Sequence, residues 1–524
     1  MNPLLDDDLL TLLLEEDADA VQARSSRSRP DRAPLSFAQQ RLWLEQQRDP
    51  NRSAYNLPRA LRLTGELNAD ALEQALNRVI DRHDILRTAF TEIDGAATQV
   101  IERNASLIVH RENLAALDQP TRELALSQRI EQHARQPFDL TQAPLMRATL
   151  LRLGSDEHVL LLNMHHIVSD AWSNTILMQD MAMAYARALL GDPSTLPPLP
   201  LQYADYASWQ RGDYVQSPAC HRSGAYWSDY LGHELPALEL PQEFARTANQ
   251  QHMAGRVQVS LDPAMVQALD TFCQREGLTP FVVALAAWQL LLARYSNQND
   301  FTVGVPNANR NSHESQELVG FFVSSQVYRA RIDSTRSALD FLRDLRAQSL
   351  AALEHADYPL ELILDQLQRP GAQGASALFQ VLFNWRTGSS SPSAPNLGQL
   401  TLEFLSTGDN QAKFDLSLDV DYSQQQLLAT FEYSRDLYRA ETIERMAGHW
   451  QNLLRGLVET TGCALGELQL LSADEHRKTL GDWNRQPTQL RSEQCLHRLI
   501  ETHAASTGDA IALTFEGQHM SYAE

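Results

Sequence analysis

Two adjacent histidines are the residues of this chain that are best placed to do chemistry. His165 and His166 follow an apolar stretch, residues 159–164, and Asp170 comes four residues after the second histidine. Imidazole is the side chain best suited to take up and release protons near neutral pH. The apolar stretch predicts a buried strand that ends at the pair, and α/β folds usually place their chemistry where strands open into loops. The pattern therefore predicts a catalytic site at this strand end.

A metal site built from the same residues is an alternative by ligand type. It is disfavoured because adjacent residues of a strand point to opposite faces, and because no third strong ligand accompanies the histidine pair. We therefore expect no metal at this position, and no covalently bound cofactor in the chain.

The composition describes a large globular protein with an acidic balance. With 524 residues the chain is too long for one ordinary core, so two or three domains are expected. A hydrophobic content of 43% excludes a disordered chain, and a formal net charge of −22 argues against nucleic acid or an anionic membrane as the main partner. The four cysteines lie far apart and no signal peptide or membrane-spanning stretch is visible, so we expect a cytoplasmic protein with reduced thiols.

Hydrophobic periodicity predicts helices and strands in two mixed α/β halves. The expected strands cover residues 145–153, 159–164 and 301–306. The expected helices cover residues 70–83, 175–190, 264–276, 280–295, 338–355 and 441–458. Ahead of these elements we expect an acidic amphipathic helix at residues 3–16, which either packs on the body or docks a partner, and an Arg- and Ser-rich linker at residues 24–32.

Five further segments accompany the histidine motif in a set order along the chain. The six together are SFAQQRLW (36–43), RHDILRT (82–88), HHIVSDAW (165–172), YADYASWQ (203–210), VGFFV (319–323) and HADYPLE (355–361). In sequence and in order they resemble the core motifs of the condensation domains of nonribosomal peptide synthetases. One HHxxxD motif alone is a weak signal, whereas six ordered motifs within residues 34–470 are a strong one.

The resemblance implies an α/β fold of two lobes related to chloramphenicol acetyltransferase, arranged as a V-shaped pseudodimer around a central tunnel. A donor acyl thioester would enter from one face, and an amine carried on the phosphopantetheine of a carrier protein would enter from the other. The amine would attack the thioester carbonyl and form an amide directly. The chain would then be an acyltransferase whose partners are carrier proteins.

The same resemblance divides the chain into five parts. They are an N-terminal helix and linker (1–33), an N-terminal lobe (34–200), a C-terminal lobe (201–471), a linker (472–494) and a fragment that resembles the start of an adenylation domain (495–524). The last part implies an adenylation domain downstream in the same assembly line.

The resemblance assigns the chemistry to His166. An amine is already a good nucleophile and a thioester a good acyl donor, so the site has to align them, accept a proton and stabilise a tetrahedral intermediate. His166 is the candidate for these tasks through one ring nitrogen, either as a base or as a positioning group. His165 is expected to brace the loop rather than to react.

Asp170 is expected to shape the loop rather than to touch substrate. It would pair with a buried arginine, and Arg87 and Arg147 are the candidates for that partner. Removing one side of such a pair would leave an unpaired buried charge at a cost of about 3–5 kcal/mol. Trp172 either flanks the tunnel or packs in the core.

Two places in the chain depart from the family pattern. Ala171 stands where the family usually carries glycine; we expect that a small side chain is sufficient there, because only a positive φ would strain alanine. Ser324, Ser325 and Gln326 stand where the family often reads Asn-Thr-Leu, close to the tunnel, so they are expected to alter substrate preference.

Three functions fit these motifs, and the sequence favours the first. As a starter domain of a lipopeptide synthetase, the chain would N-acylate the first amino acid from acyl-CoA; the short segment ahead of the motifs and the residues at 324–326 favour this role. As an elongation domain, it would join L-configured donor and acceptor groups and receive a peptidyl thioester from a separate upstream synthetase. A non-catalytic platform that recruits partner enzymes is the third, and the intact His166 argues against it.

Overall fold

The computed structural model describes residues 31–51, 53–232, 234–246, 253–367, 378–388, 397, 400–407, 412–423, 426–460, 462–485 and 495–524. The expected helix at 3–16 and most of the linker at 24–32 lie outside these residues. Contacts divide the chain into two compact units, one that extends to Leu470 and one from Leu471 to Glu524.

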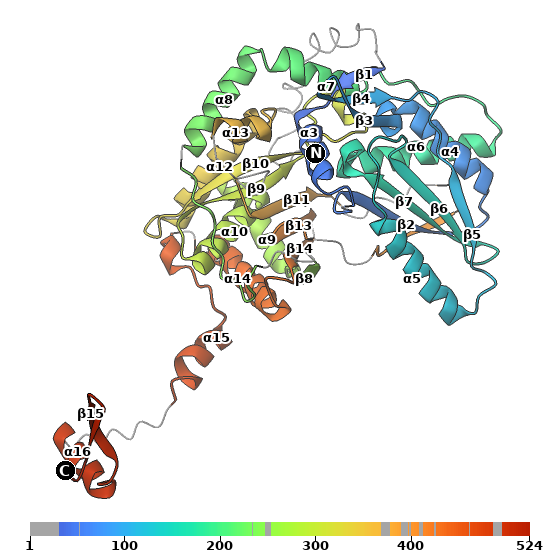
Figure 1. The fold of residues 1–524 in the computed structure, drawn as a ribbon. Helices are drawn as coiled ribbons and strands as arrows, with labels where there is room; N and C mark the ends of the chain where they lie inside the picture. The colour runs from blue at the N-terminus through green and yellow to red at the C-terminus, as the bar shows by residue number, and fades with distance from the viewer. Residues whose placement is uncertain are drawn as a thin grey trace. The chain divides into compact units, whose positions relative to one another are not determined.

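The first half of the larger unit is built on a five-stranded sheet and a three-stranded sheet (Figure 1). Its strands are β1 (Arg32–Pro34), β2 (Asn56–Thr64), β3 (Thr88–Ile93), β4 (Ala96–Ile101), β5 (Val109–Asn113), β6 (Met146–Arg152), β7 (Glu157–His165) and β12 (Thr401–Leu405). The strand orders are β12-β2-β7-β6-β5 and β1-β4-β3. Only β5 and β6 pair in parallel, and the other neighbours are antiparallel.

Helices cover both faces of the five-stranded sheet, because successive side chains of a strand point to opposite sides. The helices of this half are α3 (Phe37–Arg48), α4 (Ala69–Arg82), α5 (Gln119–Arg135) and α6 (Ala171–Leu189). Leu61 and Leu162 share a hydrophobic core with side chains of α4 and α6. Ala60 and Leu161 instead belong to the core formed with α5. Figure 1 shows α5 on the side of the sheet away from α4 and α6.

The second half of the larger unit contains a six-stranded sheet with the order β10-β9-β11-β13-β14-β8. The strands are β8 (Ala254–Ser260), β9 (Asp300–Asn307), β10 (Ser324–Arg331), β11 (Val381–Thr387), β13 (Leu416–Ser423) and β14 (Gln426–Ser434). The helices are α7 (Tyr203–Trp209), α8 (Pro218–Leu231), α9 (Pro263–Glu276), α10 (Pro280–Ser296), α11 (His313–Gln316), α12 (Ala338–Glu354), α13 (Leu360–Gln366) and α14 (Ala440–Glu459). Within the described residues no single helix has the length and apolarity to cross a membrane; α9 and α10 meet that test only as a pair, bent by 107°.

The periodicity of the sequence locates these elements well. The strands predicted at 145–153, 159–164 and 301–306 are confirmed as β6, β7 and β9, and the predicted helices as α4, α6, α9, α10, α12 and α14. The largest difference is at the start of α6, which begins at Ala171 rather than at 175. Asp170 caps its first turn by accepting a hydrogen bond from the Ser173 N–H (2.8 Å).

Two segments of the second half complete the first half. β12 follows β11 along the chain but pairs with β2, so it covers what would otherwise be an open edge of the first sheet. Residues 318–322 also contribute to the core that α4 and α6 share. Two segments of the expected C-terminal lobe, residues 201–471, therefore pack into the expected N-terminal lobe, residues 34–200.

The smaller unit contains α15 (Ala473–Arg477), α16 (Leu496–Ser506) and a hairpin of β15 (Ile511–Phe515) and β16 (Gln518–Ser521). The tight turn of the hairpin places Gly517 at a φ of 79°, which glycine adopts without strain.

Another glycine, Gly320 in the VGFFV segment, allows a tyrosine to pack against the backbone. A Cβ on Gly320 would lie 2.0 Å from Cδ2 of Tyr203, a fully buried residue of α7. The Tyr203 hydroxyl donates to Phe321 O (2.6 Å) and lies 2.9 Å from Ser36 Oγ. These hydrogen bonds hold the ring in place, so the backbone of the VGFFV segment can approach it only without a side chain at Gly320.

We expect Gly320→Ala to lower the free energy of unfolding by about 1–3 kcal/mol, because the methyl group overpacks a ring that cannot move. Gly212→Ala is the matched control, since a Cβ there meets no atom within 4 Å. It is expected to leave stability unchanged or to raise it by about 0.4–1 kcal/mol. Urea denaturation followed by tryptophan fluorescence measures both variants, and equal midpoints would contradict the packing argument.

Candidate active site

The histidine pair lies where β7 ends and the chain turns into α6, as the apolar pattern predicts. His165 is the last residue of β7, a short 3-10 turn spans His166–Val168, and α6 begins at Ala171. The backbone N–H of His166 donates to Tyr55 O (2.8 Å), which fastens the turn to the residue before β2. The two imidazoles therefore sit where β7, β2 and α6 meet.

The two ring nitrogens of His166 differ in their hydrogen bonding. Nδ1 lies 2.8 Å from Ser169 O. A carbonyl oxygen only accepts, so Nδ1 carries the hydrogen and the lone pair of the neutral ring is on Nε2. The ring is half-buried and packs edge-on against Phe321, with centroids 4.9 Å apart. Nε2 is thereby able to accept a hydrogen bond from a reacting N–H group.

Burial keeps the His166 imidazole neutral. Burial, aided by the positive charges of Lys413 and Arg41, lowers the pKa of His166 from its ordinary value of 6.5 to about 3. A neutral imidazole of this kind accepts a hydrogen bond at neutral pH but holds a full proton poorly.

His165 has the opposite tautomer and packs among different groups. Its Nδ1 accepts a hydrogen bond from Ile167 N (3.1 Å), so Nε2 carries the hydrogen. The ring is fully buried and contacts Tyr55 and Phe138 rather than Phe321. Burial lowers the pKa of His165 to about 3 as well. The bond to Ile167 ties the ring to the backbone of the turn, which supports the bracing role expected for it.

Asp170 is paired with a buried arginine from the second half of the unit. Nη2 of Arg310 donates to both carboxylate oxygens of Asp170 (3.0 and 3.1 Å), and the two side chains are 1% and 3% exposed. Asp170 also accepts hydrogen bonds from Ser173 Oγ (2.7 Å) and from Phe322 N (3.1 Å). Arg310 in turn donates to Leu318 O (2.6 Å). This network fixes the turn that carries the histidine pair, residues 165–170, to the VGFFV segment.

The prediction that Arg87 or Arg147 pairs with Asp170 is wrong. Arg87 is bound to Asp84, three residues away (2.5 Å). Arg147 donates to the carbonyls of Gln136 and Pro137 (2.9 Å each). Both arginines thus find acceptors near their own strands, and the buried partner comes from 140 residues further along the chain than Asp170.

The two residues after Asp170 have structural contacts. Ala171 is exposed at the first position of α6 and is not among the residues with a positive φ, so the backbone there does not require glycine. Trp172 is half-buried against the first core, and its Nε1 donates to Gln316 O (3.0 Å). Its contacts are with the packed segment around Arg310, and it lines neither of the two cavities described below.

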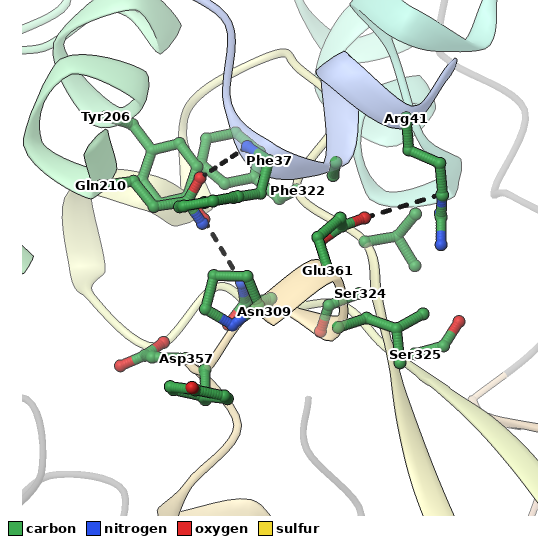
Figure 2. Close-up of a pocket in the computed structure, with 15 residues that line it drawn as sticks. Phe37, Arg41, Tyr206, Gln210, Asn309, Phe322, Ser324, Ser325, Asp357 and Glu361 are labelled. Carbon is green, nitrogen blue, oxygen red and sulfur yellow. Dashed lines mark hydrogen bonds and ion pairs between the residues drawn. The ribbon is translucent and has the colours of Figure 1, made fainter. Parts of the chain in front are cut away.

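A small pocket of about 20 Å³ lies between α3, α7 and α13 (Figure 2). Figure 2 shows Arg41 of α3 directed toward Glu361 of α13, with Nε and Oε1 3.7 Å apart. Phe322 lines this pocket and follows Phe321, which packs on the His166 ring, so the pocket lies near the imidazole.

The three predicted substrate-proximal residues divide between this pocket and the core. Ser324 and Ser325 line the pocket (Figure 2). The prediction for Gln326 is wrong: its side chain is 5% exposed, and Nε2 donates to Ala352 O (2.9 Å). Ala352 belongs to α12, so Gln326 is held against that helix rather than exposed in the pocket.

A larger cavity of about 1310 Å³ lies beside β2 and α5. It is lined by Asn56, the ladder partner of His165, and by Lys413, whose charge acts on His166. It therefore begins next to the turn that carries the histidine pair. Its lining carries an excess of three positive charges, although the chain as a whole has a net charge of −22. The charged lining residues are Arg59, Arg62, Arg135, Arg256 and Lys413 against Glu123 and Glu131.

Three positively charged residues of the site have no assigned role in the sequence interpretation. Arg310 and Lys413 stand outside the six motifs, so nothing in their local sequence marks them. Arg41 lies within the SFAQQRLW motif, the first of the six motifs, so its membership of that motif could have marked it as a site residue. In the described part of the chain, no group of three or more His, Cys, Asp or Glu side chains is arranged to hold a metal ion.

Comparison with known proteins identifies related sequences over nearly the whole chain. A family model described as "Condensation domain" matches residues 30–480. A linear gramicidin synthase from Brevibacillus parabrevis is 37% identical over 505 residues, which cover 95% of this chain and 6% of the relative. The chain spans 6% of the length of this relative and 19% of the length of bacitracin synthase 2 from Bacillus licheniformis.

Solved structures share the fold. The X-domain from teicoplanin biosynthesis, in complex with OxyB, has a TM-score of 0.76 at 27% identity and covers 86% of this chain and 98% of that one. The condensation domain of the Monacolin K polyketide synthase MokA has a TM-score of 0.70 at 21% identity, with coverages of 84% and 100%. The α/β fold expected from the motifs is confirmed by these likenesses.

We expect Asp170→Asn to lower the free energy of unfolding by about 3–5 kcal/mol, because it leaves the guanidinium of Arg310 buried without a counter-charge. Glu112→Gln is the control: it breaks the surface pair with Arg129 (2.9 Å) and should cost at most about 1 kcal/mol. Urea titrations measure both.

The double variant Asp170→Asn with Arg310→Gln should lose less stability than the sum of the two single variants, since each single change removes the same interaction. Additive losses, or an Asp170→Asn cost no larger than that of the surface control, would contradict the assigned pairing.

Proposed function

The chain belongs to the condensation domains of nonribosomal peptide synthetases, which are amide-bond-forming acyltransferases, and we propose that its own reaction joins a carrier-bound donor acyl group to the amine of an aminoacyl carrier protein. The observation that carries the proposal is the hydrogen bond from Nδ1 of His166 to Ser169 O, which leaves the Nε2 lone pair for the incoming amine.

The reaction needs alignment more than it needs a strong base. The amine nitrogen attacks the thioester carbonyl carbon, the C–S bond of the tetrahedral intermediate breaks, and the proton lost by nitrogen ends on the departing thiolate. Nε2 of His166 accepts a hydrogen bond from the amine and directs its lone pair at the carbonyl. Because the pKa of His166 is about 3, the imidazole serves mainly to position the amine, and full proton transfer to it is unfavourable.

We favour an elongation role for the domain, in which the donor is bound to a carrier protein. The relatives with the higher identities, between 31% and 37%, are synthases and synthetases such as those of linear gramicidin. The large cavity beside β2 begins at the catalytic turn, and its excess of positive charge suits the phosphate of a phosphopantetheine arm. We therefore propose that a peptidyl or aminoacyl thioester enters there from a carrier protein, and that an adenylation domain works with the chain in the same assembly line.

A starter role is the second candidate. The same excess of cationic side chains in the large cavity would also suit the phosphates of acyl-CoA. In that case the domain would acylate the first amino acid, as the residues at 324–326 led us to expect. The reaction at the carbonyl and the role of His166 would be the same for both donors.

One assay tests the reaction and separates the two donors. The acceptor is an aminoacyl group on a carrier protein, and the donors are a peptidyl carrier protein and a series of acyl-CoAs. The product is identified by mass spectrometry. We expect product from the carrier-bound donor, and a loss of about 100-fold or more for His166→Ala. His221→Ala, a change at an exposed helix position, is the control and should match the wild type.

Product from acyl-CoAs alone would establish the starter role instead. Full turnover by His166→Ala would contradict the proposed mechanism. A chain that binds carrier proteins but forms no product from any donor would be a recruitment platform.

The pH dependence of the reaction should follow the acceptor amine and not His166. The pKa of His166 is lowered to about 3, so the ring stays neutral as the pH falls from 8 to 5 and contributes no change in rate near 6.5. An α-amine with an ordinary pKa of about 7.7–8.0 must lose a proton to attack, so kcat/KM should rise with pH up to that value. With a second acceptor whose amine has a different pKa, the rising part of the curve of kcat/KM against pH should shift by the difference between the two amine pKa values. A limb that stays near 6.5 for both acceptors would contradict the neutral imidazole.

A further inference from the structure

The large cavity has four arginines, and one of them differs from the others. Among the residues that the structure describes, Arg59 has no acidic side chain paired with it, whereas each of the other three does. The paired arginines and their partners are Arg62 with Glu157 (2.8 Å), Arg135 with Glu131 (2.9 Å) and Arg256 with Glu432 (2.9 Å).

The surroundings of Arg59 favour an added anion. The side chain is half-buried on β2, and the pKa of its guanidinium is lowered first by burial and then by the positive charge of Arg386. Arg386 is already bonded to Asp421 (2.5 Å), so its charge is compensated while that of Arg59 is not. An oxyanion that enters the cavity would gain charge-assisted hydrogen bonds from Arg59.

The register of the sheet places Arg59 close to the reaction centre. Asn56 pairs with His165, and Arg59 lies three residues further along β2, which is about 10 Å. Its side chain stands on the face opposite to Asn56, because successive residues alternate; this is the face of its ladder partner Leu162, which shares a core with Phe321, the residue that packs on the His166 ring. The phosphate of phosphopantetheine or CoA is separated from the thioester sulfur by the whole length of the pantetheine chain, so it would lie farther out. A substituent a few bonds from the thioester carbonyl is the part of the donor within reach.

We propose that Arg59 binds a carboxylate on the donor group and thereby selects donors such as aspartyl or glutamyl thioesters. The inference rests on the proposed function, because it takes the large cavity as the donor side. An asparaginyl or glutaminyl donor has nearly the same shape but no charge, so it leaves the guanidinium without a counter-ion.

The test compares acidic donors with their amides. The values of kcat/KM are measured for aspartyl and asparaginyl groups, and for glutamyl and glutaminyl groups, each loaded on a carrier protein, with one fixed aminoacyl carrier protein as acceptor. We expect the wild type to favour each carboxylate by about 10- to 100-fold. Arg59→Gln should bring the ratio close to one, and Arg59→Lys should retain part of it. Arg62→Gln removes a charge that is already paired and should keep the wild-type ratio.

Three results would overturn the proposal. A wild-type ratio close to one would show that the cavity does not select a carboxylate. An equal loss on acidic and amide donors in Arg59→Gln would show that Arg59 binds the pantetheine chain, which all donors share, or supports the fold. If the wild type formed no product from any donor, the proposed function itself would be wrong. Product formed equally well from acidic and amide donors would contradict only the role of Arg59.

Discussion

The ion pair between Asp170 and Arg310 is the interaction on which the geometry of the site depends. It lies almost wholly out of water, and each charge has further hydrogen bonds: Asp170 accepts from Ser173 and Phe322, and Arg310 donates to Leu318. A buried pair of this kind is costly to desolvate, and these further hydrogen bonds offset part of that cost. The pair therefore joins the turn after β7, the start of α6 and the VGFFV segment, although those segments belong to different halves of the unit.

The two histidines have fixed tautomers and stay neutral near neutral pH. The two imidazoles have opposite tautomers, each set by one backbone group: Ser169 O for His166 and Ile167 N for His165. Burial lowers both pKa values to about 3, so neither ring changes its charge near neutral pH. Such a pair suits a reaction between an amine and a thioester, in which both reactants are already reactive and mainly require alignment. It would suit a reaction that needs a strong base much less well.

Both cavities are lined by residues from the two halves of the larger unit. β12 covers the edge of β2, and Lys413 lies at the wall of the large cavity. The small pocket is closed by α3 from one half and by α13 from the other. A cationic lining within a strongly acidic protein concentrates attraction for anionic groups in one place, while the remaining surface repels them.

The sequence by itself determined the family and most of the elements, and its motifs led to the prediction that His166 is the reactive histidine. Periodicity located β6, β7 and α4 because burial of one face imposes it on nearby residues, and the ordered motifs located His166. Only the tertiary structure decided which arginine meets Asp170, which way Gln326 points, and that Arg41 and Lys413 act on the imidazole. Those facts are contacts between residues far apart in the chain. No local pattern encodes them, because they depend on how the two halves pack and on which strand face each residue occupies.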